Sequence, residues 1–225
     1  MIIRDHKINR PDTKTIDFSQ VNSKNLLLIF TRNTVLGKCK TRLAVHIGDR
    51  AALESYRLLL KHTLGITSRL HAHKVVYYSE EIPTDDIWPG TLFEKKVQQG
   101  ADLGQRMANA FANGFDRGFE KIIVMGSDML DLEQRDLEAA FGALEDHEVV
   151  LGPALDGGYY LLGMKQERPE LFMHKDWGTD TVLEATLEDL KDTKTALLQE
   201  RNDIDRYEDI KDNPAFAPIL KKYKK

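Results

Sequence analysis

The chain has 225 residues, of which 41% are hydrophobic and 30% are charged, and its net charge is −4. This composition excludes a disordered chain, and the length suits one α/β domain that buries roughly 70–75% of its unfolded surface. The single cysteine excludes an intramolecular disulfide, the apolar runs are too short for a membrane span and no signal peptide is visible, so we expect a cytoplasmic protein.

The first half of the chain begins with a polar segment and then alternates between strand and helix patterns. Residues 1–23 lack apolar periodicity, and we expect them to be an N-terminal extension of a single domain over residues 24–225. The uniformly apolar run at 25–30 predicts a strand that is buried on both faces of a parallel sheet. Apolar spacing near 3.6 predicts a helix over 48–70, and residues 74–78 predict a second strand.

The alternation continues along the rest of the chain and decides the fold class. Helices are predicted over 102–118, 132–145 and 180–191, and strands over 121–125, 148–151, 159–163 and 195–198. Strands that alternate with helices predict a single-domain, three-layer α/β/α sandwich around a Rossmann-like, mostly parallel sheet. Ligands of such sheets bind outside the carboxyl ends of the strands, so residues that directly follow a strand are the candidates for a site.

A basic loop follows the first predicted strand. Residues 18–48 contain five basic residues and no Asp or Glu, although acidic residues outnumber basic ones 36 to 32 in the whole chain. Lysine and arginine suit phosphate oxygens and glycine permits close backbone approach, so the loop predicts a site for a diphosphate or triphosphate. A nucleic-acid footprint usually spreads over a whole domain, which argues against a nucleic-acid partner. The loop residues concerned are Arg32, Gly37, Lys38, Lys40 and Arg42.

Carboxylates stand at two further positions where a site is expected. Asp128 follows the strand at 121–125, where it could bind the Mg²⁺ or Mn²⁺ that phosphate chemistry commonly uses, although a helix cap is the alternative. Asp203 and Asp205 alternate along an extended segment, so at most one of them would reach a given metal ion. Capping by Asp205 is the simpler interpretation of that spacing.

Two motifs with glycine complete the candidates. Asp156 precedes Gly157 and Gly158 in a turn between two predicted strands, where the backbone could approach a ligand, although Asp-Gly is also a common turn dipeptide. Asp102 stands at the start of a predicted helix, where an anion or a sugar could bind, and capping is again the alternative.

Taken together, these motifs resemble a known family. Their order and spacing are similar to those of the DUF2064 group of nucleotide-diphospho-sugar transferase-like proteins, some of which are labelled arsenosugar-biosynthesis glycosyltransferases. The resemblance extends over about residues 25–212, and its most specific part is the Gly-Pro-Ala-x-Asp-Gly-Gly-Tyr-Tyr segment. The segments that carry it are 37–43, 102–107, 126–128, 152–161, 176–179 and 203–205.

The resemblance implies a GT-A fold, in which the loop after the first strand holds a nucleotide. It implies a divalent cation, Mg²⁺ or Mn²⁺, on Asp128, with Asp205 completing the metal site, and it places Asp156 on the acceptor side as a base or acceptor ligand. The residues expected to bind the nucleotide are Thr31, Arg32, Gly37, Lys38, Lys40, Arg42, Asp102 and Gly104. The residues expected to contact the substrate are Asp156, Gly157, Gly158, Tyr159, Trp177 and Thr179.

Three functions remain open at this point. The first is a metal-dependent glycosyltransferase that transfers a sugar from a nucleotide-diphospho-sugar to a small acceptor, with Asp128 and Asp156 as catalytic residues. The alternative within the same fold is a nucleotidyltransferase that joins an NTP to a phosphorylated small molecule, similar to phospholactate guanylyltransferases. The third is a non-catalytic nucleotide-binding protein, which requires that the carboxylates serve only as caps.

Overall fold

The computed structural model describes residues 23–224, so the predicted N-terminal extension lies outside the described residues except for Ser23. The strands are β1 (Asn25–Thr31), β2 (His73–Tyr78), β3 (Glu94–Val97), β4 (Lys121–Gly126), β5 (Val149–Pro153), β6 (Tyr159–Met164) and β7 (Thr195–Leu197). The α-helices are α1 (Thr41–Ile47), α2 (Asp49–Thr67), α3 (Leu103–Asp116), α4 (Gln134–Asp146), α5 (Val182–Asp189) and α6 (Ala217–Tyr223). Two short 3₁₀ helices are η2 (Pro169–Phe172) and η3 (Tyr207–Asp209).

The strands form one sheet in the order β3-β2-β1-β4-β6-β5-β7. β1 pairs in parallel with both β2 and β4, and β2 pairs in parallel with β3. β6 runs antiparallel to its neighbours β4 and β5. The chain builds one side of the sheet from β1 to β3 and then returns to the other side of β1 with β4. The carboxyl ends of β1 and β4 therefore meet where the strand order reverses, which is where α/β sheets bind ligands.

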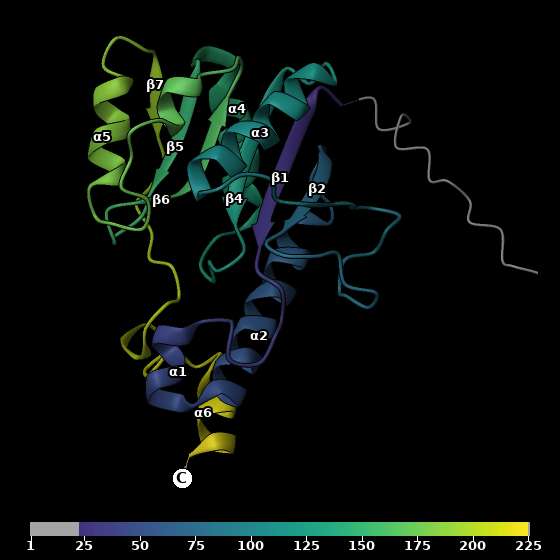
Figure 1. The fold of residues 1–225 in the computed structure, drawn as a ribbon, viewed down its shortest axis with the longest axis vertical. Coiled ribbons are helices and arrows are strands. Elements are labelled where there is room, and N and C mark those ends of the chain that lie inside the picture. The colour runs from purple at the N-terminus through teal and green to yellow at the C-terminus, as the bar shows by residue number, and fades with distance from the viewer. Residues whose placement is uncertain (1–22, 225) are drawn as a thin grey trace, which may run out of the picture.

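Helices cover both faces of the sheet (Figure 1). Successive residues of β1 point to opposite faces, so Leu27 and Ile29 join a core with α2 and α4, whereas Leu26 and Leu28 join a core with α3 and α5. All four side chains are at most 1% exposed, as their uniformly apolar sequence predicts for a central parallel strand. This three-layer α/β/α sandwich with a mostly parallel sheet confirms the predicted fold class.

Among the strands and α-helices of residues 23–224, three have no counterpart in the sequence prediction. β3 has the sequence Glu-Lys-Lys-Val and all of it is half-buried, so it lacks the apolar run of a central strand. α1 interrupts the predicted basic loop, and α6 contains a proline in its first turn. Both helices lie beyond the carboxyl end of β1 with the beginning of α2 (Figure 1).

None of the helices in the described part of the chain is long and apolar enough to cross a membrane.

Candidate functional site

The loop after β1 is anchored to the end of β2 before it reaches α1. Asn33 is buried, and its amide nitrogen donates to the carbonyl oxygen of Glu81 over 2.7 Å. The amide oxygen of Asn33 accepts the backbone N–H of Glu80 over 3.0 Å. The thiol of Cys39 donates to the Asn33 carbonyl oxygen over 3.1 Å, and burial raises the pKa of that thiol. These contacts fix the path of the loop independently of any ligand.

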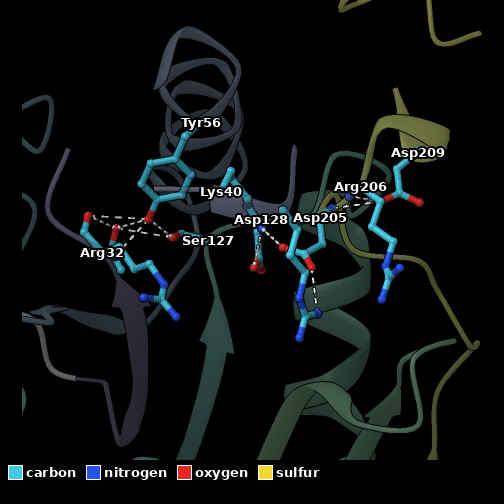
Figure 2. Close-up of polar contacts among 10 residues, drawn as sticks. Arg32, Lys40, Tyr56, Ser127, Asp128, Asp205, Arg206 and Asp209 are labelled. Atoms are coloured by element: carbon cyan, nitrogen blue, oxygen red, sulfur yellow. Dashed lines mark hydrogen bonds and ion pairs between the residues drawn. The ribbon is translucent and has the colours of Figure 1, made fainter. Parts of the chain in front are cut away.

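Lys40 ends the loop and directs its ammonium group at two carboxylates (Figure 2). Its backbone has φ 47° and ψ 50°, a left-handed conformation that is uncommon for a residue other than glycine. Nζ of Lys40 lies 3.0 Å from Oδ2 of Asp128 and 3.9 Å from Oδ1 of Asp205, and 8% of the side chain is exposed. Arg42 adds an ion pair of 2.9 Å to Oδ2 of Asp205. These four residues are called the Lys40 cluster below.

The ionisation of the Lys40 cluster follows from its charges. Burial alone would lower the pKa of Lys40, but Asp128, and then Asp205 and Asp203, more than offset burial and raise this pKa. Asp203 lies beside the cluster and forms no ion pair with any of residues 23–224. Burial, and then the negative charge of Asp128, raise the pKa of Asp203 to about 6, with Lys40 acting in the opposite direction. The site therefore holds an excess of carboxylates around one buried ammonium group.

The segment after β7 brings Asp205 to the cluster. The backbone N–H of Ile204 donates to the carbonyl oxygen of Asp128 over 3.1 Å, so this segment crosses the end of β4. The carboxylate of Asp209 accepts the backbone N–H groups of Asp205 (2.9 Å) and Arg206 (2.6 Å) (Figure 2). Because Asp209 satisfies these donors, the side chain of Asp205 is left to pair with the two basic residues. The predicted alternative, capping by Asp205, is therefore not what the structure shows.

Capping accounts for Asp102 but not for Asp128. The exposed side chain of Asp102 accepts the backbone N–H of Gln105 over 2.8 Å and caps α3. The first turn of α4 is instead capped by Glu133 and Asp136. The Asp128 carboxylate is thus held at the end of β4 by its ion pair with Lys40, not by a helix terminus.

A buried hydroxyl network joins the ends of β1 and β4 beside the Lys40 cluster (Figure 2). The hydroxyl of Tyr56, on α2, lies 2.9 Å from Oγ1 of Thr31 and 3.0 Å from Oγ of Ser127. It also accepts the backbone N–H of Arg32 over 2.8 Å. Burial raises the pKa of Tyr56, so the hydroxyl stays protonated. Thr31 is buried within this network.

The basic side chains of the loop do not converge on one point. Lys38 pairs with Glu80 over 3.1 Å, and both side chains are more than half exposed. The guanidinium group of Arg32 has no hydrogen bond or ion pair within residues 23–224 and lies apart from the Lys40 cluster (Figure 2). Gly37 turns the loop between them with φ 77°. The structure thus brings two of the four predicted cations to the carboxylates.

Several predicted substrate residues form a second group around Trp177. The rings of Tyr159 and Trp177 meet edge-on with centroids 6.4 Å apart. Gly104 packs directly beneath the indole, because a Cβ at this position would lie 2.4 Å from Nε1 of Trp177. The hydroxyl of Tyr159 is buried and has no hydrogen-bond partner within the described residues. Gly104 therefore has a packing role that requires the absence of a side chain.

The Asp-Gly-Gly turn presents one carboxylate oxygen to solvent. Oδ1 of Asp156 accepts the backbone N–H of Gly158 over 2.9 Å, and the side chain is exposed. Gly157 has φ 84°, and its carbonyl oxygen accepts the N–H of Leu183 over 2.8 Å, which ties the turn to α5. Thr179 forms a neighbouring turn through its hydroxyl group. Asp156 lies near enough to Asp203 to contribute to its raised pKa, but it is outside the Lys40 cluster.

The carboxylates of the Lys40 cluster could hold a metal ion together with substrate phosphates, but they do not form a complete metal site by themselves. Asp128 and Asp205 offer the carboxylate oxygens that Mg²⁺ and Mn²⁺ prefer. Within residues 23–224, no three side chains of His, Cys, Asp or Glu come together in a group that could hold a metal ion. Proteins often hold Mg²⁺ with one or two carboxylates and substrate phosphates, so two carboxylates suffice for a cation bound together with a diphosphate.

Sequence reasoning left Asp203 undecided and did not find Tyr56 or Asn33. The alternation of Asp203 and Asp205 correctly marked the segment, but only the crossing over β4 shows that both charges lie beside Asp128. Tyr56 lies within the apolar pattern of a helix, which gives no sign that its hydroxyl has a function. Asn33 carried one weak signal, a polar residue directly after a buried strand.

The comparisons with known proteins agree with this fold. The family model described as "Uncharacterized protein conserved in bacteria (DUF2064)" matches residues 63–179. The chain is 30% identical to a protein of known structure from Desulfovibrio desulfuricans G20, named as a candidate nucleotide-diphospho-sugar transferase. The similarity covers 89% of this chain and 95% of that chain, with a TM-score of 0.77. No curated protein matches the sequence.

More distant structures share the fold. The 4-diphosphocytidyl-2C-methyl-D-erythritol synthase of Anaerococcus prevotii DSM 20548 is 10% identical, with 84% of this chain and 93% of that chain covered and a TM-score of 0.55. The inositol-1-phosphate CTP transferase of T. maritima is 15% identical, with 88% and 96% covered and a TM-score of 0.50. The family match spans more than half of the chain, and with the 30% identical structure it establishes that this chain belongs to the DUF2064 family.

Proposed function

We propose that this chain is a transferase that binds a nucleotide-diphospho-sugar at the Lys40 cluster and transfers the sugar to a small acceptor. The observation that carries the proposal is the position of the cluster, at the carboxyl ends of β1 and β4 where the strand order reverses. The 30% identical structure is named for this class of enzyme, and the more distant transferases share its fold.

The cluster supplies the charges that a departing diphosphate needs. Lys40 and Arg42 are the two cations at the cluster, and fixed positive groups in a partly enclosed site stabilise developing negative charge without reorganisation. Their present partners are Asp128 and Asp205, so a bound diphosphate would share or replace these ion pairs. The buried network around Tyr56 keeps the ends of β1 and β4 at a fixed separation during this exchange.

A divalent cation belongs to the proposal as a ligand of Asp128 and Asp205. When bound, it would neutralise charge on the diphosphate as the leaving group departs. The support for a cation that binds together with the nucleotide is that Asp128 and Asp205 would provide two of its ligands and the phosphate oxygens would provide others. Asp128 is held by Lys40 in an orientation that keeps its carboxylate at the open edge of the sheet.

Asp156 is our candidate for the residue that acts on the acceptor. Its Oδ1 is occupied by the Gly158 N–H, whereas Oδ2 makes no hydrogen bond within the described chain. In the transfer, the bond from the sugar C1 to the diphosphate oxygen breaks and a bond from C1 to the acceptor oxygen forms. Oδ2 of Asp156 would take the proton that the acceptor hydroxyl loses. Tyr159 and Trp177 form the apolar wall beside this turn.

A nucleotidyltransferase is the second candidate, because a specific feature favours it. Asp128 and Asp205 both lie beside the ammonium group of Lys40, and Asp203 adds a third carboxylate nearby. A group of carboxylates around a cation suits the binding of an NTP, whose triphosphate carries more negative charge than a diphosphate. The distinction lies in the products. Sugar transfer releases a nucleoside diphosphate, whereas nucleotidyl transfer to a phosphorylated acceptor releases pyrophosphate.

The proposal is tested by thermal unfolding with UDP- and GDP-sugars, CTP and GTP, each with and without Mn²⁺. A ligand at about 100 times its dissociation constant stabilises the folded state by roughly 2.7 kcal/mol, so a true ligand raises the melting temperature measurably. We expect nucleotide sugars with Mn²⁺ to give the largest shift. Asp128→Asn should abolish the Mn²⁺-dependent part of the shift, and the exposed Asp146→Asn should keep it.

The outcomes separate the candidates. A larger shift with an NTP than with any nucleotide sugar would favour nucleotidyl transfer, and a pyrophosphate assay would then settle the products. A shift that Asp128→Asn leaves intact would remove the metal role of Asp128. If no nucleotide shifts the transition, with or without Mn²⁺, the proposed function is wrong.

A further inference from the structure

A second polar hollow lies between α2 and the segment that follows β2. It has a volume of about 230 Å³, below the range of roughly 300–1,000 Å³ for pockets that take drug-sized ligands, so it suits a small molecule. Three basic residues line it. Arg32 comes from the loop after β1, and Arg57 and Lys61 come from α2.

The three basic side chains form no direct polar contact in the part of the chain that the structure describes, although the charge of Arg57 contributes to lowering the pKa of Glu54. Within residues 23–224, none of them makes a hydrogen bond or an ion pair through its side chain, and Arg32 is held only by its backbone. Arg57 and Lys61 are four residues apart, so they lie on the same face of α2, where like charges destabilise a helix. The hollow thus collects positive charge that the fold does not neutralise.

The acidic residues of the hollow do not offset this charge. The carboxylate of Asp86 accepts the Tyr78 hydroxyl over 2.5 Å and the backbone N–H of Trp88 over 2.9 Å. It also pairs with Lys95 over 2.7 Å and is 9% exposed, so its charge is already satisfied. Asp85 is the remaining acidic residue of the lining, against three free cations. The hydroxyl of Thr34 adds a neutral donor.

Four further residues of the lining are apolar, which indicates that part of the ligand is apolar. Leu60, Pro83, Ile87 and Trp88 form this part of the hollow. Trp88 is 2% exposed and fixed edge-on against Phe93, with ring centroids 5.0 Å apart. The carbon skeleton of an anion held by arginine and lysine in this hollow could therefore pack on a rigid apolar wall. Arginine and lysine are the residues that recognise phosphate oxygens most effectively.

We propose that this hollow binds the phosphate group of a small phosphorylated molecule, with Arg32, Arg57 and Lys61 on the phosphate and the apolar wall against its carbon skeleton. The site is distinct from the Lys40 cluster, because Tyr56 stands between the two and its hydroxyl contacts the backbone of Arg32 on one side and Ser127 on the other. The proposal does not depend on the transferase assignment.

Calorimetric titration of the full chain with inorganic phosphate and with phenyl phosphate tests the proposal. Phenyl phosphate joins a phosphate group to a ring that the apolar wall would contact. Arg57→Gln/Lys61→Gln should weaken its binding about tenfold or more, because two charge-assisted contacts are lost. The matched control is Arg50→Gln/Arg69→Gln, which removes two exposed positive charges from the same helix region outside the hollow. This control should bind phenyl phosphate as the wild type does.

Tryptophan fluorescence shows whether the phosphate compound binds in the hollow. In a Trp177→Phe background, Trp88 is the only tryptophan, so phosphate binding in the hollow should change its emission. Tighter binding of phenyl phosphate than of inorganic phosphate identifies a phosphorylated molecule as the ligand, and equal binding identifies free phosphate. The proposal is overturned if the two double variants lose affinity equally, if neither probe binds the wild type, or if the nucleotide that stabilises the Lys40 site displaces phenyl phosphate.

Discussion

At the scale of single residues, Lys40 connects the backbone of the loop with the charge of the site. A non-glycine residue at φ 47° is kept in place only when its surroundings fix it. Here the ammonium group is fixed by Asp128 and Asp205, and the carbonyl oxygen of Lys40 begins α1 by accepting the N–H of Ala44 over 2.9 Å. The strain of the backbone and the ion pairs of the side chain therefore depend on each other.

Lys40→Met tests this dependence. Removal of the ammonium group leaves Asp128 without its ion-pair partner and Asp205 with Arg42 alone, and breaking a buried ion pair typically costs about 3–5 kcal/mol. Because both aspartates are partly exposed, we expect a loss of roughly 2 kcal/mol in the free energy of unfolding without metal. Mn²⁺ should restore more of this loss in the variant than it adds to the wild type, since it can replace the missing charge. Chemical denaturation with and without Mn²⁺ measures both effects.

Lys38→Met is the matched control for the same loop. Its ion pair with Glu80 is exposed on both sides, and such pairs contribute about 0–1 kcal/mol. We expect a small change in stability and no increase in the effect of Mn²⁺. If Lys38→Met and Lys40→Met behave alike, Lys40 is not the residue that balances the carboxylates.

The sequence identified the residue types of the site better than their partners. Asp128 was a candidate because it directly follows a buried strand, and the structure places it at the reversal of the strand order. The basic loop predicted four cations around a diphosphate or triphosphate, but Lys38 pairs with Glu80, and Arg32 lines another hollow. These partners come from distant segments, and no local pattern encodes which side chains a fold brings together.

At the scale of elements, the Asp-Gly-Gly turn is fixed by its contact with the beginning of α5. Gly157 has φ 84°, and a Cβ at this position would lie 2.2 Å from the carbonyl oxygen of Asp180. The turn is therefore a closely packed junction between β6 and α5, and not only a reversal of the chain. The orientation of Asp156, one residue before, depends on that junction.

A comparison of Gly157→Ala with Gly178→Ala separates the cost of backbone strain from the cost of the steric clash between a Cβ and the backbone of Asp180. Gly178 has nearly the same φ, 86°, but a Cβ there would meet nothing within 4 Å. The left-handed conformation costs alanine about 1–2 kcal/mol at either position. Gly157→Ala should lose a further 1–3 kcal/mol or so, because the backbone must also shift away from α5. Urea denaturation of the two variants measures the difference, and equal losses would mean that the junction is not closely packed.

The elements that the sequence predicted share one property. Strands such as β1 and β4 have apolar runs because they are buried in the centre of the sheet. The helix α2 has a strong helical period because one of its faces packs on the sheet. β3 was not predicted because it lies at the edge, where charged residues are normal. α6 was not predicted because its apolar residues pack on α2, a contact between segments more than 150 residues apart.

At the scale of the whole molecule, one carboxylate adds side-chain contacts to the backbone pairing that holds the edge strand β3 on β2. Glu94, on β3, accepts from His73 of β2 over 2.9 Å and from Arg117 at the end of α3 over 2.8 Å. Lys96 lies 3.4 Å away on the same strand, and the buried Tyr77 is the other titratable group affected by this charge. Burial acts to raise the pKa of Glu94, but His73, Arg117 and Lys96 together lower it to about 2.

The sign of the pH dependence follows from this lowered pKa. Because the unfolded chain binds the proton near pH 4.5 and the folded chain only near pH 2, Glu94 stabilises the folded state fully above pH 4.5. That stability is lost as the pH falls from about 4.5 to about 2. Glu94→Gln should therefore lower the free energy of unfolding at pH 7 by roughly 1.5–3 kcal/mol, the range for hydrogen bonds to a charged group.

The same variant should flatten the fall in stability between pH 4.5 and pH 2, because the titrating group is gone. Glu120→Gln is the control, since its ion pair with Lys24 is about two-thirds exposed on both sides and contributes little. Denaturant unfolding at a series of pH values gives both slopes. If Glu94→Gln keeps the wild-type slope below pH 4.5, other carboxylates govern the acid unfolding, and the edge of the sheet is held by its backbone pairing with β2 instead.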